Sequence, residues 1–462
     1  MNARTSTKNT ANYDRMVSTP VSRLIVRLCI PTILSMVITN LYNLVDAAFV
    51  GTLGNSASGA VGVVFGFMPI LQAIGFMAGQ GSGSIISRCL GKKDYDKAGI
   101  MASTAFFWAF FFSCLISLVC FVFIDTLVEL LGSTPTIAPY AKTYISFILM
   151  TAPFAVTSFT LNNILRYEGK AFFGMIGLLS GAVLNIGGDM LFMFGLKMGI
   201  AGAGLSTAIS QVVSFMILLF SFVTKKTVCT LSIKKASGSF KVVADIFTAG
   251  LPSLLRQALN SITGILLNVE AGRFGDEAVA GMSISSRIFF FMFAIAIGVG
   301  QGFQPVCGFN YGAGKYSRVR KAYRFTWGMS EVLMVIAGTA VFFASPSLVR
   351  LFRDDAVVQM IASRALRLQC IAVMFLPFCM ATEMLLQCTG NKTGAAFVSS
   401  LRSGILFIPI LLILAPLRGL SGIEEAQPLA YILSVLPVIP FALNFFRKLP
   451  AKDEGPVVQD KA

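Results

Sequence analysis

The chain has 462 residues, of which 55 % are hydrophobic and 13 % are charged, and its mean hydropathy is +0.77. Because soluble domains carry roughly 25 % charged residues, this composition excludes an ordinary soluble protein and indicates a polytopic membrane protein. The formal charge of +16 does not indicate nucleic-acid binding, since the basic residues cluster in short segments between apolar stretches. The chain has no histidine, so any proton relay must use carboxylates. With no CxxC pair among the nine cysteines, no metal site is expected.

Twelve apolar stretches, each long enough to cross about 30 Å of hydrocarbon as a helix, predict the architecture. The expected fold is an all-α integral membrane protein with twelve transmembrane helices in two pseudo-symmetric six-helix lobes. The predicted spans are 22–48, 57–84, 98–124, 138–164, 171–194, 199–223, 246–271, 278–306, 322–345, 361–387, 394–415 and 427–446. The predicted domains are a disordered cytoplasmic tail (1–20), an N-lobe (21–223), a cytoplasmic linker (224–245), a C-lobe (246–448) and a second cytoplasmic tail (449–462).

An internal repeat supports the two-lobe prediction. When the sequence is shifted by 221 residues, segment 31–95 aligns with segment 252–316 without a gap. The shared residues include Pro31/Pro252, Gly51/Gly272, Gly54/Gly275, Gly79-Gln80-Gly81/Gly300-Gln301-Gly302, Gly91/Gly312 and Tyr95/Tyr316, and the same shift matches Gly169 with Gly390. Shared glycine and proline indicate shared backbone geometry. Because six spans per half is an even number, the halves should run in the same direction and rock against each other, with the two prolines as bend points.

The span 171–194 carries Asn185 and Asp189 inside an otherwise apolar run. Four residues apart on a helix, the two side chains share one face. An aspartate at the centre of a membrane helix costs on the order of 2.5–3.5 kcal/mol on insertion scales, so it needs a partner, a proton or a cation. A hydrogen bond to a neighbouring helix would satisfy Asp189 structurally. The functional interpretation is a proton or cation site on a transport path.

Polar stripes at helical spacing mark three more spans. The stripes contain Ser35, Thr39, Asn43 and Asp46 in the first span, Thr207, Gln211 and Ser214 in the sixth, and Ser253, Gln257, Asn260 and Asn268 in the seventh. Helix packing through small and hydroxyl residues explains part of this pattern. A water-filled cavity between the halves explains all of it, and it makes Asn43, Gln211, Gln257 and Asn260 candidates for contact with a substrate.

The charges inside the spans differ between the halves. The first half has Asp46 and Asp189 with no obvious basic partner, whereas the second half has Arg256, Glu270, Arg287 and Glu383. By depth in the membrane, we predict two structural ion pairs, Arg256 with Glu383 and Glu270 with Arg287. Unpaired acids in one half and paired charges in the other place the cation site in the first half.

Four segments of the sequence are distinctive: PTILSMVITNLYNLVDAAFVGTLG in span one, the loops GKKDYDKA and GAGKYSRVRKA, and the block LNIGGDMLF…GIAGAGLSTAIS over spans five and six. Together they resemble the multidrug and toxic compound extrusion (MATE) family, most closely its DinF/MepA-like bacterial branch. In that branch an acidic cation or proton site lies in the N-terminal half, and by position its residues fall on Asp46, Asn185, Asp189 and Thr207. The glutamate that the NorM-like branch uses in span seven falls near Asn260, which is not acidic.

The resemblance implies a secondary active multidrug efflux transporter that exports organic cations in exchange for H⁺ or Na⁺, with no cofactor and no enzymatic activity. It further implies a multi-pass protein of the cell membrane that contacts the bilayer and small molecules, does not bind nucleic acid and acts as a monomer. The alternative from the wider superfamily is a lipid-linked oligosaccharide flippase, for which more cationic cavity residues are expected. An intramembrane prenyltransferase would need clustered metal-binding acids, of which Asp94 and Asp96 are the nearest example. A channel lacks a filter segment here, and the loop after span two lacks the Asp-Arg-x-Gly-Arg-Arg pattern of major-facilitator transporters.

The distribution of lysine and arginine predicts that both termini are cytoplasmic, since the predicted cytoplasmic loops hold the largest basic clusters. A single cysteine at position 234, introduced into a chain in which all nine native cysteines are replaced, should therefore react with membrane-impermeant maleimide only after the cells are opened. Labelling of that cysteine in intact cells would contradict the predicted orientation.

Overall fold

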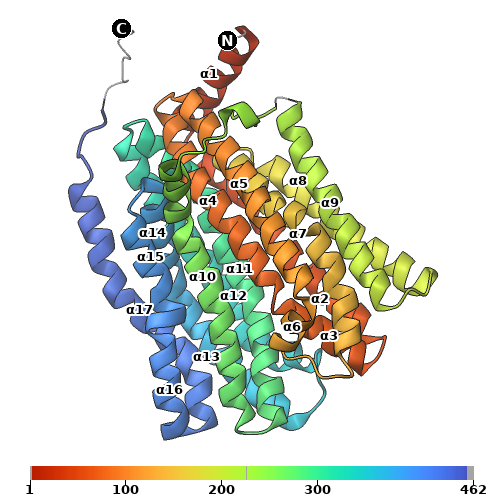
Figure 1. The fold of residues 1–462 in the computed structure, drawn as a ribbon. Coiled ribbons are helices and arrows are strands. Elements are labelled where there is room, and N and C mark those ends of the chain that lie inside the picture. Colours follow the sequence, from red (N-terminus) through yellow and green to blue (C-terminus); the bar gives the residue numbers. More distant parts are fainter. Residues whose placement is uncertain (1–2, 225, 455–462) are drawn as a thin grey trace. The chain divides into compact units, whose positions relative to one another are not determined.

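The computed structural model describes residues 3–224 and 226–454, without the side chains of residues 3–9 and 55. In these residues the chain forms helices and no strand (Figure 1). The elements of the first half are α1 (Ala3–Ser18), α2 (Val21–Gly51), α3 (Asn55–Phe65), α4 (Met68–Gly91), α5 (Tyr95–Val122), α6 (Ile124–Leu130), α7 (Ala138–Tyr167), α8 (Ala171–Asp189), η1 (Met190–Gly195) and α9 (Ile200–Val223). Those of the second half are η2 (Ile233–Lys235), α10 (Phe240–Gly272), α11 (Asp276–Gly312), α12 (Tyr316–Arg350), α13 (Ala356–Ala372), η3 (Val373–Phe375), α14 (Leu376–Thr389), α15 (Lys392–Ser400), η4 (Leu401–Ile405), α16 (Phe407–Arg418) and α17 (Leu420–Lys448).

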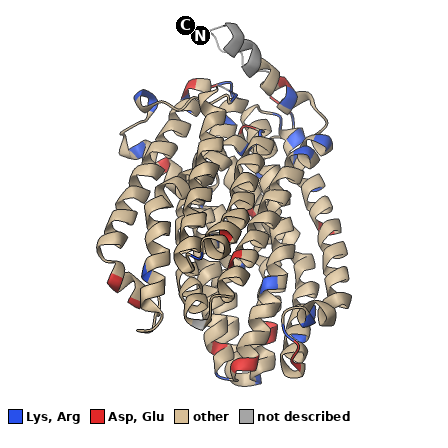
Figure 2. Ribbon diagram, turned by 90° about the vertical axis from the view of Figure 1, so that its right-hand side faces the viewer, with Lys and Arg blue, Asp and Glu red and all other residues tan. Residues whose placement is uncertain are grey.

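Eleven helical stretches in the described part of the chain are long and apolar enough to cross a membrane. They correspond to eleven of the twelve predicted spans. The predicted seventh span is α10, a helix of 33 residues in which Arg256, Gln257, Asn260 and Asn268 interrupt the apolar run. Figure 2 shows how few charged residues lie along the helices compared with the helix ends and loops. The predicted all-α membrane fold is thus confirmed.

The chain forms two compact units, which we call unit 1 (Met1–Thr19 and Leu34–Leu254) and unit 2 (Pro20–Ile33 and Leu255–Ala462). The units differ from the predicted lobes at one end of each: the start of α2 belongs to unit 2, and the start of α10 belongs to unit 1. Both changes of unit come two residues after a proline inside the helix, Pro31 in α2 and Pro252 in α10.

The backbone of the two halves repeats with the 221-residue shift found in the sequence. Gly54 and Gly275 precede α3 and α11 with φ/ψ of 111°/172° and 102°/172°. Gly169 and Gly390 also have positive φ, 79° and 94°. Because L-residues rarely adopt these conformations, both halves need glycine at the same two turns. Lys93 (φ 61°) matches Gly314 (φ 68°) in the same way, although its residue type differs.

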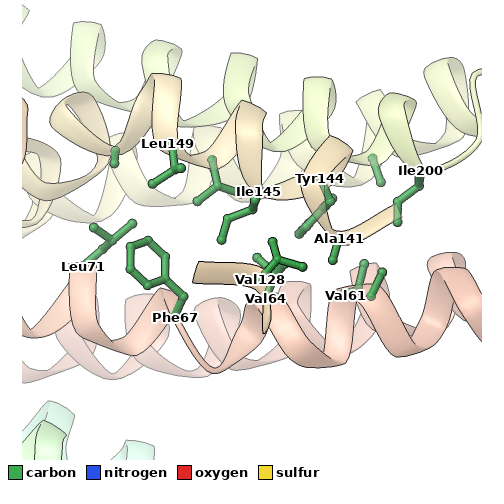
Figure 3. Close-up of a cluster of buried hydrophobic side chains, with 14 of the residues drawn as sticks. Val61, Val64, Phe67, Leu71, Val128, Ala141, Tyr144, Ile145, Leu149 and Ile200 are labelled. Atoms are coloured by element: carbon green, nitrogen blue, oxygen red, sulfur yellow. The ribbon is translucent and has the colours of Figure 1, made fainter. Parts of the chain in front are cut away.

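Small residues allow the helices of unit 1 to approach closely. A Cβ added at Gly79 would lie 2.7 Å from Cβ of Asn163 in α7, and a Cβ at Gly81 would lie 2.1 Å from the carbonyl oxygen of Ile246 in α10. These contacts explain why the Gly-Gln-Gly motif of α4 carries glycine on both sides of Gln80, since close helix packing in membranes depends on small residues. Further along, α3, α4, α6 and α7 enclose the apolar cluster of Figure 3, which includes Val64, Phe67 and Ile145.

The predicted disordered tail at residues 1–20 is wrong for its described part, because Ala3–Ser18 is a helix, α1. Its C-terminal end docks on unit 1. The Met16 side chain is fully buried, Arg15 Nη2 donates to the carbonyl oxygen of Gly169 (2.9 Å), and Lys93 Nζ lies 4.5 Å from the ring centroid of Tyr13. The polar composition of this helix carried no signal of the docking, which involves Tyr13, Arg15 and Met16.

Hydrogen bonds also hold the linker between the two halves against the helices of unit 1. Both oxygens of the buried Glu168 carboxylate accept backbone hydrogen bonds of 2.8 Å from Val228 and Cys229, and Trp108 Nε1 donates to the carbonyl oxygen of Ser237 (3.1 Å). Consequently the described linker residues up to Ser239 belong to unit 1 rather than hanging free.

The start of the second tail packs on the loop before α12, and residues 455–462 of that predicted tail lie outside the described part. The Glu454 amide donates to the carbonyl oxygen of Gly314 (3.0 Å), and the Asp453 carboxylate accepts from the amide and hydroxyl of Ser317 (2.7 Å each). Partial burial raises the pKa of Asp453, but these bonds and the charges of Lys315 and Arg320 outweigh burial and hold the pKa below its usual value.

The close approach at Gly81 can be tested. The Gly81→Ala variant should lose about 1–3 kcal/mol of stability, because its methyl group would overlap the backbone of α10. Gly62→Ala, whose Cβ would meet nothing within 4 Å, is the matched control and should be neutral or stabilising. Thermal unfolding of the purified variants in detergent measures both, and equal melting temperatures would contradict the packing described here.

Candidate functional site

Unit 1 gathers a cluster of polar side chains from four helices. We call this the acid cluster: Asp46 of α2, Tyr144 of α7, Asn185 and Asp189 of α8, and Ser206 and Thr207 of α9. Asp189 and Tyr144 are fully buried, and Asp46 is 4 % exposed. The four residues that the sequence and the resemblance indicated, Asp46, Asn185, Asp189 and Thr207, therefore lie together in the structure.

Hydrogen bonds orient the neutral members of the acid cluster. Asn185 Nδ2 donates to Thr207 Oγ1 (3.2 Å), and the Ser206 hydroxyl donates to the carbonyl oxygen of Asn185 (2.8 Å). The Tyr144 hydroxyl donates to Asp46 Oδ2 (3.3 Å). These bonds leave Asp46 Oδ1, Asn185 Oδ1 and both Asp189 carboxylate oxygens without a direct hydrogen bond among the described residues. The open positions are all oxygen acceptors, and they belong to one cluster.

The two carboxylates share this buried space without a cation from the protein. Asp46 and Asp189 lie close enough for each to act on the charge of the other, and Ser206 is a neighbour of Asp189. No lysine or arginine of the described chain forms an ion pair with either acid. Two neighbouring carboxylates in a poorly hydrated site cannot both stay ionised and unpaired, so the cluster must hold a proton or a cation. Carboxylate, amide and hydroxyl oxygens are also the ligands that hard cations prefer.

Two cavities of unit 1 lie beside the acid cluster. The larger, of about 260 Å³, is lined among others by Tyr42, Asn43, Phe159, Thr207 and Gln211. The smaller, of about 30 Å³, is lined by Asn185, Thr207 and Gln211 among others. Thr207 therefore belongs to the acid cluster and to both cavity walls. Two of the predicted substrate-contact residues, Asn43 and Gln211, line the larger cavity.

The helix carrying the aspartate changes its winding directly after it. Residues Met190–Gly195 form a π-helix, in which the amide of Leu196 donates to the carbonyl oxygen of Leu191 (2.8 Å). Such π segments inside α-helices often occur at functional sites. The glycine-rich sequence Ile186-Gly187-Gly188-Asp189 precedes the change, and at Gly188 a Cβ would lie 2.5 Å from Ser206 Oγ. Glycine at this position thus lets α9 approach the aspartate.

Unit 2 has a charged cluster of a different kind. Arg256 Nη1 of α10 lies 2.5 Å from Glu383 Oε1 of α14, which is the ion pair that the sequence predicted. A second arginine, Arg402 in η4, places Nη1 3.8 Å from Glu383 Oε2. All three side chains are buried, and Arg402 also stacks on Phe293 with its guanidinium carbon 5.2 Å from the ring centroid. One carboxylate thus faces two guanidinium groups.

The second predicted ion pair, Glu270 with Arg287, is not formed. Glu270 pairs with Arg273, the first residue after the end of α10, at 2.9 Å. The helical spacing i, i+3 makes this local pair geometrically easy, and it was overlooked because Arg273 lies just beyond the predicted span. Arg287 instead lines a cavity of unit 2.

That cavity, which we call the unit 2 pocket, has a volume of about 270 Å³. Its walls carry five aromatic residues, two arginines and several neutral polar groups: Phe289, Phe290, Phe293, Phe407, Tyr431, Arg287, Arg402, Asn260, Asn268, Ser283, Ser286, Ser403 and Gln427. Asn260 is the third predicted substrate-contact residue, and its Oδ1 accepts a hydrogen bond from the Ser403 hydroxyl (2.6 Å). Gln257 is not among the pocket residues.

Sequence reasoning missed Arg402 in unit 2, and Tyr144 and Ser206 in the acid cluster. Arg402 lies within the predicted span 394–415, so its charge inside an apolar run was the signal that could have found it. Tyr144 carries no such signal, because a tyrosine in a membrane helix is common and only its contact with Asp46 reveals its place.

Comparison with known proteins identifies the family. The MatE family model matches residues 31–191 and 252–413, which is more than half of the chain and reproduces the 221-residue repeat. This chain belongs to the MatE family. MatE proteins are transporters, and the chain is therefore a membrane transporter and not an enzyme.

This MatE protein is similar to the multidrug export protein MepA of Staphylococcus aureus (strain NCTC 8325 / PS 47), with 29 % identity over 87 % of this chain and 89 % of the relative. MepA of Staphylococcus saprophyticus is 27 % identical over 85 % of this chain and 87 % of the relative. Among solved structures, an outward-facing multidrug resistance MATE transporter has a TM-score of 0.87 at 25 % identity, covering 94 % of this chain and 97 % of that one. A transporter of the MOP superfamily from Pyrococcus furiosus reaches 0.88 at the same identity and coverage.

The Arg256–Glu383–Arg402 cluster predicts a large effect on stability. Glu383→Gln should lower the unfolding free energy by about 3–5 kcal/mol, because it leaves two buried arginines without a counter-charge. Asp354→Asn removes an exposed partner of Arg350 instead and should cost under about 1 kcal/mol. Thermal unfolding in detergent compares the two variants, and a Glu383→Gln protein as stable as wild type would contradict this account.

Proposed function

We propose that this transporter exports organic cations from the cytoplasm and is driven by inward flow of H⁺ or Na⁺ through the acid cluster of unit 1. The observation that carries the proposal is the pair of buried carboxylates, Asp46 and Asp189, with no basic partner among the described residues. Structural acids in membrane helices are normally paired, as Glu383 is here. An unpaired acid pair suits a site that gains and loses a positive charge in every cycle.

Multidrug export is supported by the relatives, since the similar staphylococcal proteins bear the name multidrug export protein. The larger cavity of unit 1 supports the same function, because its mix of aromatic, apolar and amide side chains fits small organic molecules of varied shape. We further propose that the protein resides in the cell membrane as a monomer. Its basic loops favour an orientation with both termini in the cytoplasm.

Thr207 gives the proposed mechanism a physical link between ion and substrate. Its hydroxyl accepts a hydrogen bond from the Asn185 amide, and the residue also lines the larger cavity. When a proton or Na⁺ enters from outside, the free oxygens of Asp189, Asp46 and Asn185 become occupied. The amide of Asn185 then changes its hydrogen bonding, and with it the orientation of the Thr207 hydroxyl in the cavity wall. The cavity also loses a nearby negative charge, so its hold on an organic cation weakens and the cation leaves outward.

Export completes when the ion leaves to the cytoplasm and one carboxylate of the pair regains its charge. Because Asp46 and Asp189 are close neighbours, they titrate as a pair and their protons belong to the cluster rather than to one residue. A single exchanged ion per cycle is sufficient for this scheme, since the second carboxylate stays neutral or hydrogen-bonded to Tyr144.

The proposal predicts that Asp189→Asn abolishes gradient-driven transport while the protein folds and inserts normally, because an amide keeps the shape but cannot cycle charge. Asp46→Asn should impair transport similarly. Uptake of ethidium into inverted vesicles, normalised to protein in the membrane, measures the effect. Asp96→Asn, whose side chain is 91 % exposed in its pair with Lys235, is the matched control and should transport at the wild-type rate.

Collapsing the pH gradient and the sodium gradient in turn identifies the coupling ion in the same vesicles. Loss of uptake with one of them assigns that ion. Wild-type uptake by the Asp189→Asn protein, present at normal levels, would disprove the proposed role of the cluster.

A further inference from the structure

The unit 2 pocket differs from the cavities of unit 1 in its charge. It contains two arginines, and no aspartate or glutamate is among the described residues that line it. Within the described part of the chain, the Glu383 carboxylate is the one acid in ion-pair contact with Arg402, and it binds Arg256 at the shorter distance of 2.5 Å against 3.8 Å. Two positive charges against one negative leave this buried cluster with an excess of positive charge.

The hydrogen-bonding capacity of Arg402 is also incomplete. Its Nη1 faces Glu383, while its Nε and Nη2 have no hydrogen-bond partner in the described chain, although the side chain is only 2 % exposed. Nε and Nη2 form one edge of the guanidinium plane, and this edge binds the two oxygens of a carboxylate side by side. Buried donors are normally satisfied, so an unsatisfied fork in a cavity wall indicates a ligand rather than a structural role.

Aromatic side chains specify the remainder of the ligand. Phe293 stacks under the Arg402 guanidinium, and Phe289, Phe290, Phe407 and Tyr431 line the same cavity. Tyr431 accepts a hydrogen bond from Gln427 Nε2 (3.0 Å), which leaves its ring to form the wall. Flat apolar walls beside a cationic fork fit a planar ring system with an acidic substituent.

We propose that the unit 2 pocket is a binding site for aromatic carboxylates, with the acid group held side-on by Nε and Nη2 of Arg402 and the ring packed among the phenylalanines. Arg287, in the same wall, adds a second positive charge at the more exposed side. The site rests on unit 2 alone and is independent of the ion coupling proposed for unit 1. It extends the ligands of this protein from organic cations to compounds that carry a carboxylate.

The test uses purified full-length protein in phosphatidylcholine nanodiscs and two probes that differ in charge, 2-naphthoate and 2-naphthalenemethanol. Equilibrium dialysis should show that 2-naphthoate binds roughly tenfold or more tightly than 2-naphthalenemethanol. The alcohol cannot form the charge-assisted bidentate contact with Arg402. This comparison requires no variant. Equal affinities for the two probes would overturn the proposal.

Variants then locate the site. Arg402→Gln should weaken 2-naphthoate binding roughly tenfold or more and leave 2-naphthalenemethanol unchanged, while Glu383 keeps Arg256 as its partner and the fold is preserved. Arg402→Lys keeps the positive charge but lacks the two-pronged guanidinium edge. Its affinity for 2-naphthoate should lie between those of the wild type and Arg402→Gln. Arg350→Gln, an equal loss of charge at an exposed position of unit 2, is the control and should bind as wild type. Equal weakening by the Arg350 and Arg402 variants would overturn the assignment.

An anionic lipid headgroup carries similar chemistry and is distinguished by one more arm. Nanodiscs that contain phosphatidylglycerol should bind 2-naphthoate as tightly as those of phosphatidylcholine alone. Loss of 2-naphthoate binding in the phosphatidylglycerol discs would assign the pocket to a lipid headgroup and overturn the proposal.

Discussion

A charge inside hydrocarbon costs several kilocalories per mole unless the protein supplies a partner, and the two units meet this constraint in opposite ways. In unit 2 the Glu383 carboxylate has two arginines, so the protein compensates the acid completely and retains an excess of positive charge. In unit 1 the carboxylates of Asp46 and Asp189 have hydroxyl and amide neighbours but no lysine or arginine partner among the described residues. In the proposed mechanism, an ion from outside supplies the missing compensation.

This asymmetry is notable because the backbones of the two halves remain so similar. Turns at Gly54 and Gly275, and at Gly169 and Gly390, keep the same left-handed or extended-positive conformations. Only glycine adopts such conformations without strain, so these positions are fixed by backbone geometry. Side chains within the spans are not fixed in this way, and there the halves have diverged into an acidic cluster and a basic one. The fold is shared, and the chemistry is specific to each half.

The sequence predicted the fold well, because length, apolarity and the glycine and proline repeat are properties of the chain itself. It also indicated Asp46, Asn185 and Asp189 as charged or amide residues in apolar runs, and Thr207 through the polar stripe of span six and the family resemblance. It failed where a contact depends on another helix: Tyr144 became part of the site only through Asp46. The predicted ion pair of Glu270 with Arg287 was also wrong, because Glu270 pairs with Arg273, which is closer in sequence. The docking of α1 was unpredictable because a polar helix with one buried methionine looks like a disordered tail.

The matched pair Lys93 and Gly314 explains a further difference between the ends of the chain. Both residues have positive φ, and lysine tolerates it in the first half. In the second half a Cβ at position 314 would lie 2.8 Å from the Cβ of Glu454, so the missing side chain creates the space that the residues after α17 occupy. Gly314 therefore repeats the backbone conformation of Lys93, and its lack of a side chain avoids an overlap with Glu454. In the second copy of the repeat, the turn at Gly314 therefore has room for Glu454 to pack against it.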